Sequence, residues 1–135
     1  AKAHELLKMV ELPEEFADRY PRSMSGGQKQ RLSIARAIAR QPEILIFDDS
    51  FSALDYKTDA TLREGLAKQL PGTTKIIVAQ RISTIRNADQ ILVLDRGEIA
   101  GLGTHDALMA SCTVYREIAM SQLSEEELKK GGASK

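Results

Sequence analysis

The sequence predicts an α/β domain, on the evidence of two short apolar runs and the helical segment between them. Residues 44–47 and 75–79 form runs of strand length, typical of strands that are buried on both faces of a sheet. Leucines at four-residue spacing predict a helix over 58–70. Because strands and helices alternate, we expect the two strands to be parallel, with functional groups at their C-terminal edge.

The remaining elements follow from apolar spacing and from Pro and Gly residues that end helices. In chain order, the prediction is a helix over 3–11, a turn-rich connection over 14–25, a helix over 27–40, the strand 44–47, the helix 58–70, the strand 75–79, a short helix over 82–87, a hairpin with strands 90–94 and 98–102, a helix through 109 and a last helix over 114–123. Thr104 is the predicted N-cap of the helix that ends near 109.

Charge and cysteine content exclude several classes of function. Lys and Arg total 19, and Asp and Glu total 19, so no excess charge directs the whole molecule to nucleic acid or an anionic membrane surface. The single cysteine, Cys112, excludes an internal disulfide and is typical of a reducing compartment. No apolar run approaches the roughly 20 residues that span a bilayer, and no signal peptide is recognisable at the N-terminus. One compact unit in the cytosol is therefore expected.

A candidate phosphate site opens the helix 27–40 and consists of Ser25, Gly26, Gly27 and Gln28. Glycines let backbone amides approach a ligand, and a helix start offers unpaired N–H groups to an anion. Lys29 and Arg31 lie in the same first turn, where the helix dipole disfavours positive charge, and a bound phosphate would compensate them. Taken alone, these residues are more often an ordinary Ser N-cap with a glycine turn.

Further candidate residues lie at and just beyond the ends of the predicted strands. Asp48 and Asp49 close the first strand, and carboxylates fixed at a strand end suit the hydrated Mg²⁺ of a nucleotide. The turn over 52–55 follows and ends in Asp55, while Gln80 follows the second strand. Each of these groups would be called an ordinary structural or loop feature if it stood alone.

Taken together, the segments MSGGQKQRLSIARAIARQPEILIFDDSFSALD and IIVAQRISTIRNADQILVLDRGEIAGLGTHDAL closely resemble the ATP-binding-cassette (ABC) ATPase family. The resemblance spans about 24–123. It implies a partial P-loop NTPase-like sheet with flanking helices and a C-terminal β-hairpin plus helices. Residues 1–123 would be the C-terminal portion of such a domain, with a helical-subdomain segment over about 1–41 and a Walker B, D-loop and switch segment over about 42–123. A disordered polar tail is expected over 124–135.

The resemblance also implies roles for the candidate residues. Ser25, Gly26, Gly27 and Gln28 match the signature motif, which in the family contacts the γ-phosphate of ATP held by the opposite domain. Asp48 matches the Walker B residue that holds Mg²⁺ through water. Asp55 matches a residue of the D-loop and is expected to take part in cofactor binding. The implied cofactors are ATP and Mg²⁺. The implied partners are a second nucleotide-binding domain and a transmembrane transporter domain, at the cytoplasmic face of a membrane, with no nucleic acid.

Two catalytic positions depart from the family pattern. The family normally has Glu after the Walker B Asp, where it polarises the attacking water, but Asp49 is one methylene shorter. The switch His is replaced by Gln80, which forms hydrogen bonds but carries no positive charge. This pairing is similar to the degenerate half of heterodimeric exporters. We therefore expect this chain to lend its signature residues to a partner that has both catalytic groups.

The phosphate loop G-x-x-x-x-G-K-[ST] does not occur in these 135 residues. We therefore expect weak ATP binding and negligible hydrolysis by the chain alone. Two alternatives stay open: an excised or engineered fragment without ATPase activity, and a soluble ABC ATPase that acts on nucleic acid. The segment before the signature resembles importers whereas the following segments resemble exporters, a mixture that fits an engineered or recombined chain.

Overall fold

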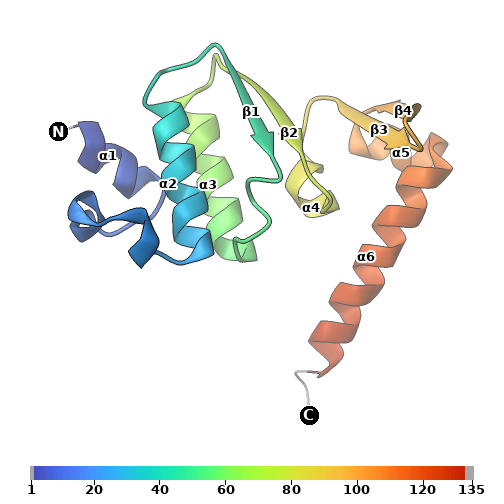
Figure 1. Cartoon of the computed structure of the whole chain (residues 1–135). Coiled ribbons are helices and arrows are strands. Elements are labelled where there is room, and N and C mark those ends of the chain that lie inside the picture. The colour runs from blue at the N-terminus through green and yellow to red at the C-terminus, as the bar shows by residue number, and fades with distance from the viewer. Residues whose placement is uncertain (1, 133–135) are drawn as a thin grey trace. The chain divides into compact units, whose positions relative to one another are not determined.

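The structure is a computed structural model that describes the backbone of residues 2–132 and the side chains of residues 2–122 (Figure 1). The elements run in the order α1 (Lys2–Met9), the 3-10 helices η1 (Glu14–Asp18) and η2 (Pro21–Ser23), α2 (Gly26–Ile38), β1 (Ile44–Asp48), α3 (Tyr56–Gln69), β2 (Thr74–Val78), α4 (Ile82–Ile85), β3 (Ile91–Asp95), β4 (Glu98–Gly103), α5 (His105–Ser111) and α6 (Thr113–Gly132). The predicted α/β class is confirmed, and each predicted helix and strand has a counterpart.

The chain forms two compact units, Ala1–Ala79 and Gln80–Lys135, where the sequence predicts one. Each unit has its own cluster of buried apolar side chains. The division follows β2, so the expected helical subdomain over residues 1–41 shares a core with β1 and α3. This sharing arises because α1 and α2 have apolar faces that pack against the strand and the helix that follow them.

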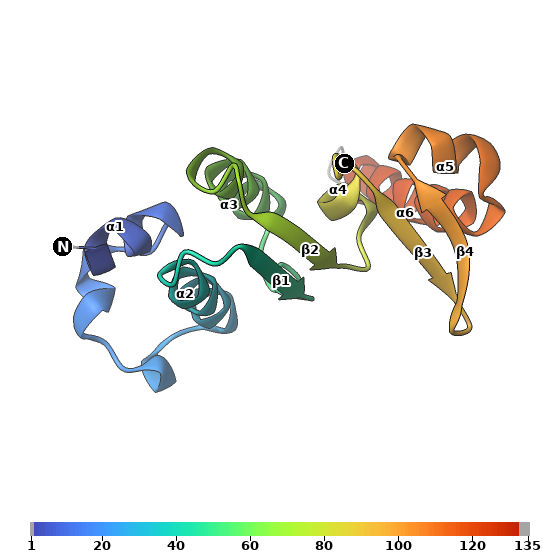
Figure 2. The ribbon, with the colours of Figure 1, turned by 90° about the horizontal axis from the view of Figure 1, so that it is seen from above.

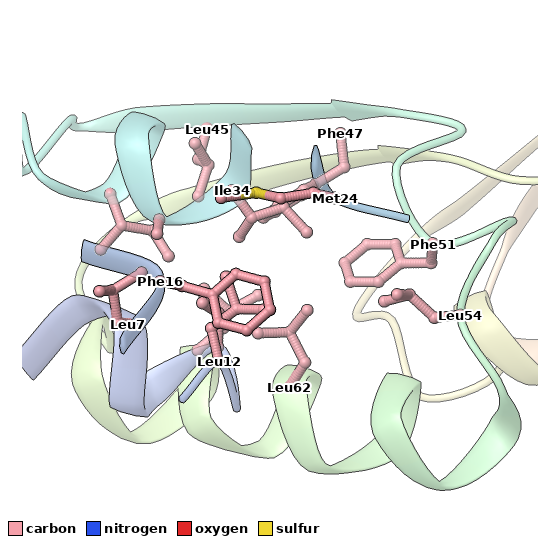
Figure 3. Close-up of a cluster of buried hydrophobic side chains, with 14 residues drawn as sticks. Leu7, Leu12, Phe16, Met24, Ile34, Leu45, Phe47, Phe51, Leu54 and Leu62 are labelled. Atoms are coloured by element: carbon pink, nitrogen blue, oxygen red, sulfur yellow. The ribbon is translucent and has the colours of Figure 1, made fainter. Parts of the chain in front are cut away.

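In the first unit, β1 and β2 pair in parallel, with Ile44 opposite Thr74 and Asp48 opposite Val78. Helices α2 and α3 both lie on one side of these strands (Figures 1 and 2). Figure 3 shows Leu45 and Phe47 pointing from β1 into a cluster that includes Leu62 of α3. Burial of these side chains provides the main force that holds helices and strands together.

The prediction that β1 is buried on both faces is wrong. Leu45 and Phe47 are 5% and 2% exposed, but Ile44 and Ile46 are 60% and 63% exposed. Successive strand residues point to opposite faces, and helices α2 and α3 lie on only one of them (Figure 1). On β2, Ile76 and Val78 are 48% and 53% exposed in register with β1. We call Ile44, Ile46, Ile76 and Val78 the open apolar face.

In the second unit, β3 and β4 form an antiparallel hairpin, with a register irregularity between Val93 and Leu94. Arg96 and Gly97 form the turn at φ values of 51° and 80°, the left-handed region that two-residue hairpin turns require. The buried cluster of this unit consists of Ile91, Val93, Leu108, Cys112 and Tyr115. Thr104 caps α5 as predicted, since its side chain accepts a hydrogen bond from the Ala107 amide.

Helix α6 extends beyond its predicted end at 123 and reaches Gly132. Residues 124–130 read SEEELKK and consist almost entirely of good helix formers, which explains the extension. The prediction of a disordered tail over 124–135 therefore started the tail too early. Residues 133–135 lie outside the described residues. Within the described residues, none of the helices combines the length and the hydrophobicity that a bilayer-spanning segment needs.

Candidate functional site

The turn formed by residues 25–28 begins helix α2 and contains a capping box. The Gln28 amide donates to Ser25 Oγ at 3.2 Å, and the Ser25 amide donates to Gln28 Oε1 at 2.9 Å. The amides of Gly26 and Gly27 occupy the first two helical positions, which have no acceptor within a helix. Ser25 Oγ acts as an acceptor in the capping box, so its hydroxyl proton can still be donated to a ligand. The 25–28 turn thus offers two amides and one hydroxyl to an anion.

The two glycines of this turn have different surroundings. A β-carbon added to Gly26 would meet nothing within 4 Å. A β-carbon added to Gly27 would lie 3.2 Å from the Ala53 carbonyl oxygen and 3.8 Å from Leu54 Cδ2. Gly27 therefore permits close packing on the turn formed by residues 52–55, whereas the β-carbon position of Gly26 is open.

Gln30 connects helix α2 to the 52–55 turn and was not predicted from the sequence. Its Oε1 accepts a hydrogen bond from the Ala53 amide at 3.2 Å, and its Nε2 donates to Ser52 Oγ at 3.5 Å. The sequence does contain a signal for it: Gln30 lies three residues after Gly27 and four before the buried Ile34, on the helix face that points to the core. A polar side chain on that face needs a polar partner.

Arg31 does not need a bound phosphate to compensate its charge, contrary to the expectation from its place in the first turn of α2. Its Nη1 donates to the Glu11 carbonyl oxygen at 2.9 Å, and its Nε donates to the Gly27 carbonyl oxygen at 3.4 Å. Glu11 follows the C-terminal end of α1, where the helix dipole is negative, so the guanidinium is well placed there. Arg31 thus fastens α2 to α1, while Lys29 is exposed.

Asp48 and Asp49 lie at the C-terminal end of β1, as predicted, and both are exposed. The Asp49 amide donates to the Val78 carbonyl oxygen at 3.0 Å, and Asp49 has a φ of 51°. Within the described residues, no group of three or more His, Cys, Asp or Glu side chains could hold a metal ion. Asp48 and Asp49 thus place two neighbouring, exposed carboxylates at this end of the strand.

Asp55 is the N-cap of helix α3. Its Oδ1 accepts from the Thr58 amide at 2.8 Å, and its Oδ2 accepts from Thr58 Oγ1 at 3.2 Å. These bonds from Thr58 lower the pKa of the Asp55 carboxyl, with a smaller contribution from Arg31. Both carboxylate oxygens thus have partners within the helix that Asp55 begins.

Gln80 is the first residue of the second unit, and its side chain is exposed. Its carbonyl oxygen accepts a hydrogen bond from Gln122 Nε2 at 2.6 Å, while Gln122 Oε1 accepts from the Ile82 amide at 2.8 Å. Gln122 therefore fixes the backbone beside Gln80 from a position far along the chain. Nothing in the local sequence around Gln122 indicates this contact.

Comparison with known proteins identifies the family to which this chain belongs. A family profile described as ABC transporter matches residues 1–52. An uncharacterized ABC transporter ATP-binding protein of Mycobacterium bovis is 52% identical over 100 residues, which are 74% of this chain and 17% of that protein. Multidrug resistance protein 3 of Entamoeba histolytica is 42% identical over 131 residues, which are 95% of this chain and 10% of that protein. The chain belongs to the ABC transporter family.

A solved structure of an ABC transporter has a similar fold. A bacterial Atm1-family ABC exporter with ATP bound matches with a TM-score of 0.79 and 32% identity, over 90% of this chain and 23% of that chain. The predicted membership of the ABC ATPase family and the P-loop NTPase-like fold are thereby confirmed. This ABC transporter chain spans less than a fifth of the length of the mycobacterial and amoebal relatives.

Proposed function

We propose that this chain belongs to an ATP-binding module of an ABC transporter and that the 25–28 turn contacts ATP held by a second nucleotide-binding domain. One observation carries the proposal: the capping box fixes the helix start and leaves the Gly26 and Gly27 amides and the Ser25 hydroxyl proton able to bind phosphate oxygens. The open space beside Gly26 leaves room for such a ligand. Backbone amides at a helix start favour an anion both by hydrogen bonding and by the helix dipole.

The nucleotide site on this chain's own side is proposed to be degenerate. Asp48 would hold Mg²⁺ through water from the end of β1, which suits its exposed carboxylate. Asp49 would reach less far than Glu toward an attacking water, and the uncharged Gln80 would not supply a positive charge to a γ-phosphate. The capping bonds of Asp55 support a role in fixing the 52–55 turn rather than in direct binding of the cofactor.

The proposed partners are a second nucleotide-binding domain and a transmembrane transporter domain. The module would then act at the cytoplasmic face of a membrane, with binding of ATP closing the two nucleotide-binding domains on each other. Equal numbers of acidic and basic residues give no support to nucleic acid as a partner. An excised or engineered chain without ATPase activity of its own is the second candidate, because the sequence contains no phosphate loop.

The test mixes the full chain with an ABC nucleotide-binding domain that has the catalytic Glu and the switch His, and it measures the rate at which labelled ATP–Mg²⁺ dissociates. The wild-type chain should slow dissociation. Ser25→Asp should abolish this effect, with a loss of about tenfold or more, because Asp caps a helix as well as Ser but repels phosphate. Ser33→Ala is the control, since Ser33 is an exposed serine of the same helix.

Two outcomes would contradict the proposal. The wild-type chain could leave ATP dissociation from the partner domain unchanged, or Ser25→Asp could slow dissociation as well as the wild type does. Calorimetry of the chain alone with ATP–Mg²⁺ separates the two candidate functions. Slower dissociation with the partner, without binding by the chain alone, supports a turn lent to the partner's ATP; no effect in either measurement supports an inert fragment.

A further inference from the structure

We infer that Gln30 is a positioning residue that couples the 25–28 turn to the backbone at Asp49. The inference deepens the proposed function and rests on it. It states how binding of phosphate at the 25–28 turn would alter the backbone at this chain's own nucleotide site. It is carried by three hydrogen bonds and by the burial of the residues that flank them. All of these residues lie in the first unit.

The hydrogen bonds form a continuous chain from helix α2 to β1. Gln30 Nε2 donates to Ser52 Oγ at 3.5 Å, and Ser52 Oγ donates to the Asp49 carbonyl oxygen at 3.0 Å. A serine hydroxyl can accept one bond while it donates another, so both bonds exist together. The Gln30 amide group also accepts the bond from the Ala53 amide at 3.2 Å. One side chain thus holds two successive residues of the 52–55 turn.

The burial pattern shows why this turn depends on Gln30. Phe51 and Leu54 are 2% and 6% exposed and are anchored in the apolar cluster (Figure 3). Ser52 and Ala53, which lie between them, are exposed and have no apolar anchorage. Their position relative to α2 is therefore set by Gln30 and by the close approach of Gly27 to the Ala53 carbonyl oxygen.

The chemistry of position 30 is specific to glutamine. The Ala53 amide donates to the side chain at position 30 and Ser52 Oγ accepts from it, and a carboxamide provides both the acceptor and the donor. Glu would keep the acceptor for Ala53 but would lose the donor to Ser52. Met has a similar length and would provide neither strong bond. These differences give three variants with separable effects.

The first measurement uses amide NMR of the full 135-residue chain without any partner. Gln30→Met should increase hydrogen exchange at the Ala53 amide by roughly five- to tenfold, the effect of one lost hydrogen bond. Gln30→Glu should keep the Ala53 amide protected. Gln69→Met is the matched control, because Gln69 is an exposed glutamine at the end of α3, and it should leave Ala53 unchanged.

The coupling itself is tested by a perturbation of the 25–28 turn, at the start of the helix that carries Gln30. Ser25→Ala removes the capping bond and should shift the amide resonances of Ala53 and Asp49 in the otherwise wild-type chain. The Asp49 shift should become smaller when Gln30→Met, Gln30→Glu or Ser52→Ala is also present, although the Ser52 amide still donates to the Asp49 carbonyl oxygen at 3.4 Å in every background. The Ala53 shift should survive in Ser52→Ala. A role of Gln30 in stability alone would not produce this pattern. An Asp49 shift of the same size in all backgrounds would overturn the inference.

Addition of the partner domain with ATP–Mg²⁺ separates failure of the inference from failure of the proposed function. If the amides of Gly26 and Gly27 shift on addition but Asp49 responds equally with and without Gln30→Met, the proposed function stands and the inference is wrong. If Gly26 and Gly27 do not shift, the proposed function is wrong. The Ser25→Ala measurement then still decides whether Gln30 couples the two turns.

Discussion

Gly27 lies so close to Ala53 that a β-carbon at position 27 would be 3.2 Å from the Ala53 carbonyl oxygen. A β-carbon on Gly26, its neighbour in the same helical turn, would meet nothing within 4 Å. Gly26→Ala should raise the free energy of unfolding by up to about 1 kcal/mol, since Ala is the better helix former. The free energy of unfolding of Gly27→Ala should be lower than that of Gly26→Ala by about 1–2 kcal/mol, because the 52–55 turn must move to admit the β-carbon. Urea unfolding measures both, and equal gains would show that the approach of Gly27 to Ala53 imposes no constraint.

Asp49 occupies the left-handed region with a φ of 51°. Asp and Asn tolerate this conformation better than longer side chains do, because their short polar groups bond locally. Asp49→Glu, which restores the residue usual in the family, should therefore lower the free energy of unfolding by about 0.5–1 kcal/mol. Asp49→Asn should be nearly neutral, and Asp49→Gly should not destabilise. Chemical denaturation checks the series, and a stabilising Glu would show that this backbone conformation is unimportant.

The capping bonds of Asp55 predict a dependence of stability on pH. Hydrogen bonds from Thr58 lower its pKa below the ordinary value of 3.8, so the unfolded chain binds the proton more readily than the folded chain does. The stabilisation is thus complete above the unfolded pKa and is lost as pH falls through the folded pKa. Asp55→Asn keeps a capping side chain but does not titrate. The difference in unfolding free energy between wild type and Asp55→Asn should be constant from pH 7 to about 5. Below about pH 4 the wild type should lose stability relative to Asp55→Asn. A difference that does not vary with pH would contradict this.

Gly101 on β4 packs directly against α5 and the residue that follows it. A β-carbon there would lie 2.9 Å from Leu108 Cδ2 and 3.0 Å from Cys112 Sγ. Gly101→Ala should therefore destabilise the second unit by about 1–3 kcal/mol through overpacking. Gly103→Ala, whose β-carbon would meet only Ala107 Cβ at 3.5 Å, should change stability by about 0.5 kcal/mol or less. Thermal unfolding compares the two, and similar midpoints would argue against tight packing at Gly101.

The helices and strands were predictable because their signals are local. Apolar spacing located them, and residues such as Pro42 and Thr104 marked their ends. The exposure of Ile44 and Ile46 was not predictable, because a continuous apolar run shows that both strand faces are apolar without showing what lies against them. The division after Ala79 likewise depends on which apolar faces meet in space.

The candidate site divides in the same way. Ser25 was recognisable as a helix start, and its capping box involves residues three positions apart. The partners of Gln30 were not recognisable, because they lie 22 and 23 positions away. The partner of Arg31, the Glu11 carbonyl oxygen, is 20 positions before it. Local sequence supports inferences about a single turn, whereas contacts of this length require the packed structure.

The open apolar face governs how the chain behaves at high concentration. Its four aliphatic side chains lie beside strand edges, a combination that favours association between copies. The formal net charge is +0 at pH 7 and the isoelectric point is about 7.0, so electrostatic repulsion between copies is weakest at neutral pH. Sulfate strengthens apolar association further. Clear, monodisperse preparations should therefore be obtained most easily in buffers of low sulfate content whose pH is well away from neutrality.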